Sequence, residues 1–463
     1  MKIVLLIDFG STYTKVTAVD LEKEIIIGTA SSFTTINTDI NKGLHIAIEN
    51  LEKKTGRLKY DKYLACSSAA GGLKMIASGL VPGATTTAAK EACLGAGAKI
   101  IKVYSFEMTK EDIEEIERIN PEIFLLAGGT NGGDKKCILH NAKMLSTCKI
   151  NFPIIIGGNN EVSNKCKKIL KDKETYIVEN VMPTFGELNI EPAQDKIRKI
   201  FLQRIIYAKG ITKVSKLISE IIMPTPSALM NAIKLLSDGY ENEMGIGELM
   251  AIDLGGATTD VYSVGEGYPK ESNVIYKGIE EPYIKRTVEG DIGMRYSIGG
   301  IIDEVGIDDI ASIANLTVKR TNEIIDFLQN NPYILPNEKN IKNLDFALSA
   351  KAVEIATIRH CGTKEKIYTS NGVAYLQKGK DLTHVKKIIL TGGSLINLYC
   401  GANDILEYVC FNEKKPESMR PKNAEILVDK KYILQAMGLL SRSYPKISIR
   451  IMKKELKYDR SYK

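Results

Sequence analysis

The sequence predicts an α/β protein made of two duplicated lobes, with an additional βαβ unit inserted in its first half. Short β-branched strands alternate with helical segments along the chain, which is typical of α/β architecture. The 463 residues exceed what one hydrophobic core usually serves, so two or more lobes are expected. A short motif near the N-terminus recurs in the second half, which indicates an internal duplication.

The first half is predicted to open with strands and then to alternate strand and helix. Strands are expected at residues 3–7, 16–19 and 24–27, and helices at 44–53, 85–96, 192–209 and 227–236. Between them lies a βαβαβ stretch, with strands at 123–126, 154–156 and 176–178 and helices at 134–145 and 161–170. We expect this stretch, roughly 120–180, to be a subdomain inserted in a first lobe that spans residues 1–235.

A second cycle starts at Leu249 and is predicted to form the second lobe, residues 236–463. Helices are expected at 301–305, 308–314, 318–328, 347–358 and 433–440, and a strand at 387–390. Near the C-terminus, apolar and basic residues alternate over 446–451, which predicts a basic strand.

Composition and charge exclude several classes of protein. The net charge is +7, and residues 413–463 hold 14 Lys/Arg against 6 Asp/Glu without a recognisable nucleic-acid module, so no nucleic-acid partner is expected. No apolar run reaches the length of a membrane span, and the first one leads directly into Asp8 instead of forming a signal peptide. The eight cysteines are dispersed and contain no CxxC pair. These features predict a cytoplasmic protein with reduced thiols and no membrane partner.

The internal repeat aligns "LLIDFGSTYTKV" with "MAIDLGGATTDV" without a gap. Matched residues are 245 positions apart, as in Asp8 and Asp253 or Gly10 and Gly255. Each copy is an apolar strand, an acid, a glycine-containing turn, hydroxyl residues and a new strand. A glycine turn exposes backbone N–H groups to an anion, so each copy is a candidate phosphate hairpin.

The residue types around the two turns suit a nucleotide with its metal. Hydroxyl donors are supplied by Ser11, Thr12, Thr258 and Thr259, and a positive charge by Lys15. Two opposed carboxylates, Asp8 and Asp253, are typical of hydrated Mg²⁺ beside a polyphosphate. A third element, Gly392-Gly393-Ser394, follows a buried strand and would let the backbone pack against a nucleoside.

These motifs resemble those of the ATPase superfamily of actin, the heat-shock chaperone ATPases and the sugar kinases. "DFGSTYTK", "DLGGATTD" and "LTGGS" are similar to its two phosphate motifs and its adenosine motif. The resemblance implies a ribonuclease-H-like (actin-like ATPase) fold, with crossing helices near 227–236 and 432–440. It also implies an ATP and Mg²⁺ cleft lined by Asp8, Gly10, Ser11, Thr12, Lys15, Asp253, Gly255, Gly256, Thr258, Thr259, Asp260, Gly392, Gly393 and Ser394. Ala257 departs from the third glycine of the chaperone motif.

Three further stretches carry a closer resemblance: "CSSAAGGLKMIASGLVP", "TTAAKEACLGAGAKI" and "RTVEGDIGMRYS". They are similar to the accessory (reactivating) protein of adenosylcobalamin-dependent glutamate mutase, or methylaspartate mutase. That resemblance implies an ATP-hydrolysing chaperone whose partners are the mutase subunits, with Asp8, Lys15 and Asp253 acting in hydrolysis. We expect the inserted unit to contact the mutase or its cofactor domain, and self-association into a homo-oligomer is a further expectation.

Other functions within the same superfamily stay open at this point. A small-molecule kinase would need a base, for which Asp260 and Asp291 are available, although Asp291 before Ile292 also fits a helix N-cap, which we favour. A membrane-docked or filament-forming relative would use an amphipathic helix where the C-terminus predicts a strand. A redox-activating ATPase would need close cysteines for an iron–sulfur cluster, which the sequence does not place together.

Overall fold

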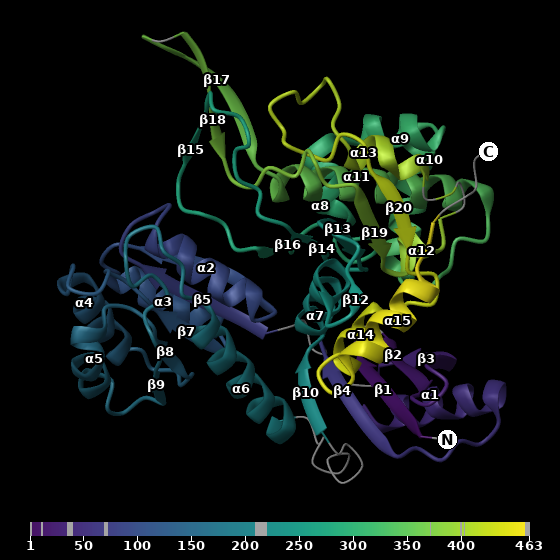
Figure 1. Ribbon diagram of the computed structural model, residues 1–463, viewed down its shortest axis with the longest axis horizontal. Helices are drawn as coiled ribbons and strands as arrows, with labels where there is room; N and C mark the ends of the chain where they lie inside the picture. Colours follow the sequence, from purple (N-terminus) through teal and green to yellow (C-terminus); the bar gives the residue numbers. More distant parts are fainter. Residues whose placement is uncertain are drawn as a thin grey trace. The chain divides into compact units, whose positions relative to one another are not determined.

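The computed structural model of the chain describes residues 2–10, 13–34, 40–68, 73–208, 220–370, 372–398, 401 and 403–458 (Figure 1). Contacts divide the chain into two units. Unit 1 comprises Met1–Asn231, Gly278–Pro282 and Gln435–Ser443, and unit 2 comprises Ala232–Lys277, Tyr283–Leu434 and Tyr444–Lys463. The chain therefore leaves unit 1 within helix α7 (Thr225–Asp238), returns briefly at Gly278–Pro282, and returns again within helix α14 (Leu434–Leu440).

The first sheet of unit 1 has the strand order β10-β4-β1-β2-β3. Its elements are β1 (Ile3–Phe9), β2 (Tyr13–Asp20), β3 (Ile25–Phe33), helix α1 (Ile40–Thr55), β4 (Lys62–Ser67) and β10 (Glu220–Pro224). β2 runs antiparallel to both neighbours, whereas β1, β4 and β10 are parallel. Because side chains alternate along a strand, Ile7 and Phe9 join the core beneath α1 while Asp8 lies on the opposite face.

A second, fully parallel sheet of unit 1 lies between β4 and β10 in the chain and has the order β6-β5-β7-β8-β9. Its strands are β5 (Leu73–Gly79), β6 (Ala98–Ser105), β7 (Ile123–Leu126), β8 (Ile154–Ile156) and β9 (Thr175–Ile177). Numbered within the insert, this is the 2-1-3-4-5 order of a doubly wound fold. The sheet includes two strands, β5 and β6, that the range 120–180 leaves out.

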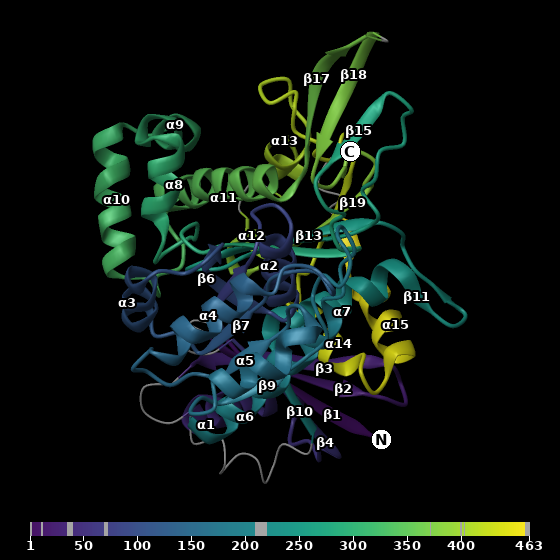
Figure 2. The same ribbon diagram turned by 90° about the vertical axis from the view of Figure 1, so that its left-hand side faces the viewer.

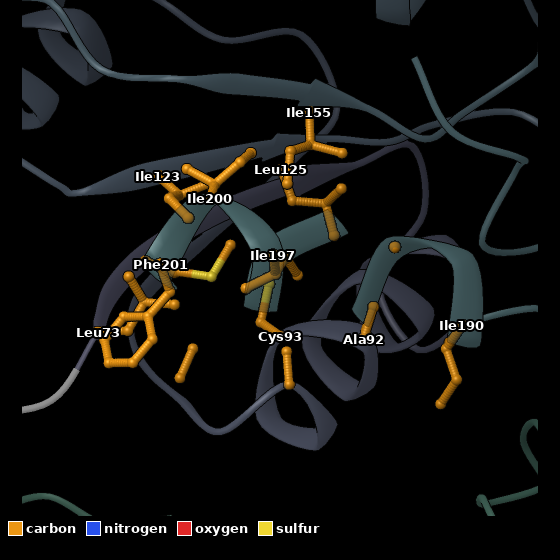
Figure 3. Packing of buried hydrophobic residues seen from close by; sticks show 14 of the residues in the cluster. Leu73, Ala92, Cys93, Ile123, Leu125, Ile155, Ile190, Ile197, Ile200 and Phe201 are labelled. Carbon is orange, nitrogen blue, oxygen red and sulfur yellow. The ribbon is translucent and has the colours of Figure 1, made fainter. Parts of the chain in front are cut away.

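Helices cover both faces of this parallel sheet. They are α2 (Thr85–Gly95), α3 (Lys110–Ile119), α4 (Lys136–Ser146), η1 (Asn160–Val162), α5 (Ser163–Ile169) and α6 (Glu191–Ala208). On one face, Ile123 and Leu125 of β7 pack with Cys93 of α2 and Ile197 of α6 (Figure 3). On the other face, α3, α4 and α5 cover residues such as Phe124. Four-residue runs such as "IFLL" can be fully apolar because the strands are buried on both sides.

The main sheet of unit 2 repeats the first sheet of unit 1. Its order is β16-β14-β13-β19-β20-β21, with β13 (Leu249–Leu254), β14 (Thr259–Val264), β16 (Ile284–Glu289), β19 (Lys387–Thr391), β20 (Glu425–Val428) and β21 (Lys457–Tyr458). β14 is antiparallel to β13 and β16, whereas β13, β19 and β20 are parallel. The first five strands thus match the order and directions in unit 1, and the predicted duplicated, ribonuclease-H-like α/β fold is confirmed.

Unit 2 adds helices over one face of this sheet and a small sheet at a distance from its core. The helices are α8 (Ile298–Val305), α9 (Ile307–Ala314), α10 (Val318–Asn330), α11 (Lys339–His360), α12 (Gly393–Ile396), η3 (Asn403–Ile405) and α13 (Leu406–Val409). A further helix, α15 (Pro445–Glu455), packs against residues 239–244. A short hairpin is formed by β11 (Gly239–Tyr240) and β12 (Glu243–Met244). Strands β15 (Val274–Lys277), β17 (Thr363–Thr369) and β18 (Gly372–Lys378) form a three-stranded sheet that projects from the rest of unit 2 (Figures 1 and 2).

The predicted basic strand at 446–451 is wrong, because these residues lie in helix α15. Pro445 occupies the first turn of the helix, where its missing N–H costs nothing. Ser448, Ile449 and Met452 are buried at helical spacing, while Arg450 points outward and bonds to Glu243 at 2.7 Å. The apolar face of α15 is therefore packed within unit 2. In the described ranges, no helix is both long and apolar enough to cross a membrane.

The buried His360 gives unit 2 a predicted acid sensitivity. Its ring nitrogens each lie 2.8 Å from a hydroxyl oxygen, of Thr287 and of Ser263. Burial, and then the charges of Lys285 and Lys380, lower the pKa of His360 well below its ordinary value of 6.5. The folded state keeps the ring neutral while the unfolded chain takes up a proton. The free energy of unfolding should therefore fall below pH 6.5, by up to about 1.4 kcal/mol per pH unit.

Denaturant unfolding of the wild type and of His360→Gln, measured from about pH 7.5 down to pH 5, checks this expectation. We expect His360→Gln to lose the acid slope, although it also loses some stability at neutral pH. The exposed His384 supplies a matched control, since His384→Gln should keep the slope. The same slope in all three proteins would contradict the assignment.

Candidate functional site

The two hairpins predicted from the repeat have the same backbone geometry. In the first, Asp8 of β1 faces Lys15 of β2, and the N–H of Gly10 donates to the carbonyl of Tyr13 at 3.0 Å. In the second, Asp253 faces Asp260, and the corresponding bond from Gly255 to the carbonyl of Thr258 is 2.9 Å. The 245-residue offset thus holds for strand register and turn as well as for sequence. Ser11 and Thr12 lie outside the described residues.

Asp8 is almost buried, with 6% of its surface exposed, and its carboxylate is held on one oxygen. The hydroxyl of Thr225, the first residue of α7, donates to Oδ1 at 2.6 Å, and the thiol of Cys66 lies 3.5 Å from the same atom. Burial, and then the Asp8 carboxylate, raise the pKa of the Cys66 thiol well above its ordinary range. Cys66 therefore stays a neutral donor, and the Asp8 side chain is fixed in orientation.

The turn of the second hairpin is clamped from behind by the segment that follows β16. The N–H of Met294 donates to the carbonyl of Gly255 at 3.1 Å, and those of Arg295 and Tyr296 donate to Gly256 at 2.9 Å each. A Cβ on Gly293 would lie 2.5 Å from the backbone of Ala257, so this close approach requires glycine. The carbonyl oxygens of the turn are thus occupied by this segment.

The backbone N–H groups of the same turn differ from its carbonyl oxygens in their hydrogen bonding. Across the described ranges, the backbone N–H groups of Gly256, Ala257 and Thr258 have no acceptor, and these residues are half-buried. Thr259 is fully buried and donates its hydroxyl to the carbonyl of Ile292 at 2.9 Å, so its side chain supports the turn. Successive unpaired N–H groups in a tight turn form an anion-binding concavity.

Asp260 forms a buried ion pair that the sequence did not predict. The Nε and Nη2 atoms of Arg286 lie 2.8 Å and 2.6 Å from Asp260 Oδ1, and the Thr258 hydroxyl lies 3.3 Å from Oδ2. Burial lowers the pKa of Arg286, but the attraction of Asp260 outweighs it and the net pKa is raised. The pair ties β14 to β16 beneath the turn.

Removal of one partner of the Asp260–Arg286 ion pair should therefore destabilise the protein. We expect Arg286→Met to lower the free energy of unfolding by about 3–5 kcal/mol, because it leaves the Asp260 carboxylate buried without a counter-charge. The double variant Arg286→Met/Asp260→Leu should recover most of that loss. Denaturant unfolding of both variants measures it, and equal losses in the two would contradict this account of the pair.

The third predicted element, Gly392–Ser394, lies against the second hairpin. β19 pairs with β13 so that Thr391 faces Asp253, and Gly392 follows with φ +96°. A Cβ on Gly392 would lie 2.3 Å from the carbonyl oxygen of Leu254 and 2.9 Å from Asp253 Oδ1. Gly393 has open space around it, and Ser394 is half-buried in the first turn of α12. Within unit 2 the structure thus brings together Asp253, the turn and the glycine pair.

One interpretation of the sequence is corrected by these contacts, and several residues were missed. Asp291 is not a helix N-cap, because it lies exposed in a turn and α8 begins only at Ile298, after Ser297. The chain bends back here, where a Cβ on Gly300 would collide with the Asp291 carbonyl at 2.0 Å.

The residues of the site that the sequence analysis missed are Cys66, Thr225, Arg286 and Tyr296. Cys66 and the stretch 286–297 lie in segments singled out by resemblance, but nothing in the sequence indicates that Cys66 or Thr225 contacts Asp8. In the part of the chain that the structure describes, no three His, Cys, Asp or Glu side chains are grouped to hold a metal.

Two solved structures that cover nearly the whole chain are distantly similar to it. The activator of the 2-hydroxyisocaproyl-CoA dehydratase from Clostridium difficile, solved with bound ADPNP, is 10% identical and covers 98% of each chain at a TM-score of 0.33. Gluconate kinase from Lactobacillus acidophilus is 11% identical over 99% of this chain and 93% of its own, at a TM-score of 0.37. These scores are low, and the fold assignment above rests on strand order and direction.

Comparison of sequences is far more specific. A family model described as MutL protein matches residues 4–456. Protein MutL from Clostridium tetanomorphum is 44% identical over 456 residues, which cover 98% of this chain and 98% of that protein. The chain therefore belongs to the MutL protein family.

Proposed function

We propose that this protein binds and hydrolyses ATP with Mg²⁺ as a cytoplasmic chaperone that reactivates or maintains a cobalamin-dependent glutamate mutase. The observation that carries the nucleotide part is the pair of hairpins with one geometry, each with an aspartate at the end of its central strand. A chance phosphate-like turn would not recur with the same register and the same turn bond in the second half of a duplicated fold.

In the proposed site, different residues would bind the metal, the phosphates and the nucleoside. Asp8 and Asp253 would hold hydrated Mg²⁺ through its waters, which suits a metal that keeps most of its waters. Lys15 and the N–H groups of Gly256, Ala257 and Thr258 would bind phosphoryl oxygens. Gly392 and Gly393, with Ser394, would form the flat backbone surface for the nucleoside. A change of phosphate contacts on hydrolysis would then shift the equilibrium between two conformations of the protein.

The assignment of glutamate mutase as the client enzyme rests on resemblance alone. The stretches "CSSAAGGLKMIASGLVP" and "RTVEGDIGMRYS" are similar to accessory proteins of glutamate mutase, and the second forms β16 with the clamp behind the turn. The inserted parallel sheet is not required by either hairpin. It is therefore the part of unit 1 that we assign to the mutase.

ATP hydrolysis by the purified protein, with and without cyanocobalamin-inactivated glutamate mutase, tests the proposal. We expect phosphate release that the inactivated mutase stimulates, and return of mutase activity when free coenzyme is added. Phosphate release without any effect on the mutase would remove the client and keep the ATPase. An absence of nucleotide binding would remove the proposal entirely.

The same assay separates the alternative, a small-molecule kinase. A kinase would transfer label from ATP to an acceptor, whereas an ATPase releases it as phosphate. Of the two candidate bases, Asp260 has its carboxylate engaged by Arg286 at 2.6 Å, which argues against Asp260 as a free base.

A further inference from the structure

The parallel sheet of the insert is attached to the rest of unit 1 at one end. The hydroxyl of Ser227 donates to the carbonyl of Ala96 at 3.0 Å, and a Cβ on Gly97 would lie 2.8 Å from Pro224. Ala96 and Gly97 directly precede β6, so this contact is at the amino ends of the strands. The carboxyl ends point the other way. We call the five loops there the carboxyl-edge surface: residues 80–84, 106–109, 127–135, 157–162 and 178–190.

The loops of the carboxyl-edge surface are bonded to one another and form one platform. The N–H of Phe106 donates to the carbonyls of Gly79 and Leu80, at 3.1 Å and 3.2 Å. The side chain of Asn180, which is 3% exposed, donates to the carbonyl of Gly129 at 3.0 Å. The N–H of Asn131 also donates to the carbonyl of Pro183 at 2.9 Å. The backbone of these loops is thus held in a defined position.

Three large apolar side chains stand out from this platform into solvent. Val81 is 42% exposed, Phe106 56% and Phe185 77%, and each follows a different strand. Phe106 has φ +64°, a strained conformation for a bulky residue, and its two backbone bonds keep it there. Rigid exposed aromatic side chains are the usual anchors of a protein interface.

The charge of the carboxyl-edge surface determines what kind of partner fits. Its loops have one basic and five acidic residues, a net charge of −4, whereas the net charge of the whole chain is +7. The acidic residues are Glu107, Asp134, Glu161, Glu179 and Glu187, and the basic residue is Lys135. Lys135 is neutralised by Glu161 at 2.5 Å. The N-terminus of α4 is also occupied, because Asp134 accepts the N–H of Cys137 at 3.0 Å. An anionic small molecule is therefore disfavoured here, and a basic partner is favoured.

We infer that the carboxyl-edge surface is where the client enzyme docks, through positively charged groups around apolar pockets that receive Phe106 and Phe185. This inference rests on the proposed function for the identity of the client. It goes further by assigning the contact to one end of one sheet and by stating the chemistry that the client must present.

Binding of the full-length protein to purified glutamate mutase subunits, followed by calorimetry, tests the apolar part. Phe185→Ser removes a side chain that makes little contact with its own fold, and Phe106→Gly suits the positive φ of its position. We expect each variant to bind the mutase at least about tenfold more weakly, with unchanged affinity for ATP. The matched control is Tyr368→Ser on β17, where an 80% exposed aromatic side chain lies in unit 2. That variant should bind like the wild type.

The charge is tested by Glu107→Lys/Glu187→Lys, with Glu365→Lys/Glu413→Lys in unit 2, which changes the net charge by the same amount, as the control. Wild-type binding should weaken as salt is added, and the double variant should lose both affinity and most of that salt dependence. If the wild type binds the mutase and the edge variants bind equally well, the inference is overturned while the proposed function stands. If the wild type binds ATP but no mutase subunit, the client assignment of the proposed function is what fails.

Discussion

Asp8→Asn should reduce ATP hydrolysis by about 100-fold. Asp8 sits at the end of β1 with Oδ1 held by Thr225 at 2.6 Å, so asparagine keeps the shape and one acceptor but loses the charge. In the proposed site that charge orders the waters of Mg²⁺, and partners of this kind typically change metal affinity or activity by 10- to 100-fold. Phosphate release across a Mg²⁺ titration measures the effect, and we expect more Mg²⁺ to be needed as well as a lower plateau.

A matched control is available in the same unit. Asp172 is exposed, and Asp172→Asn changes the net charge equally without touching either hairpin. Its hydrolysis rate and Mg²⁺ dependence should equal those of the wild type. Turnover at the wild-type rate in Asp8→Asn, with the fold intact by circular dichroism, would remove the metal assignment of Asp8.

Gly392→Ala should strongly destabilise unit 2. The residue has φ +96°, and its new methyl would lie 2.3 Å from the Leu254 carbonyl oxygen and 2.9 Å from Asp253 Oδ1. The left-handed conformation costs about 1–2 kcal/mol for a side chain, and overpacking typically costs about 1–3 kcal/mol more. We expect the free energy of unfolding to fall by roughly 2–5 kcal/mol. ATP binding should weaken as well, because the methyl displaces the strand that carries Asp253.

Substitution of the neighbouring Gly393 shows whether the effect of Gly392→Ala depends on the position of the glycine. A Cβ on Gly393 meets nothing within 4 Å, and the residue begins α12 with an ordinary backbone conformation. Gly393→Ala should therefore change stability by less than about 0.5 kcal/mol. Denaturant unfolding and ATP titration of the two variants form one experiment. Equal behaviour of the two would show that the close approach at Gly392 does not exist in solution.

The hairpins could be predicted from sequence because everything that defines them is local. Strand, acid, glycine turn and second strand lie within a dozen residues, and two copies reinforce one another. The prediction of a strand at residues 446–451 was wrong because it also used only a local pattern. Over six residues, Ile447, Ile449 and Ile451 alternate as in a strand, whereas the buried Ser448, Ile449 and Met452 reveal the helical period only over a longer window.

The insert and the supporting contacts of the site depend on pairing between distant residues, which no local pattern encodes. β5 and β6 carry Lys74, Lys99 and Lys102 among their apolar residues, so neither has the uniform run that made β7 recognisable. Thr225 meets Asp8 across 217 positions of sequence, and Arg286 reaches Asp260 only because β14 and β16 are neighbours. Such partners follow from the topology, and the topology had to be known first.

The return of the chain to unit 1 within α14 has a consequence for biosynthesis. Unit 1 includes Gln435–Ser443, which leave the ribosome after nearly all of unit 2. Domains usually fold as units in the order of their synthesis, the N-terminal one first. Here the first 231 residues must wait for a segment near the far end of the chain before their unit is complete. A ribosome that stalls late would thus release a chain with neither unit finished, and that chain would depend on cellular chaperones more than an ordinary two-domain protein does.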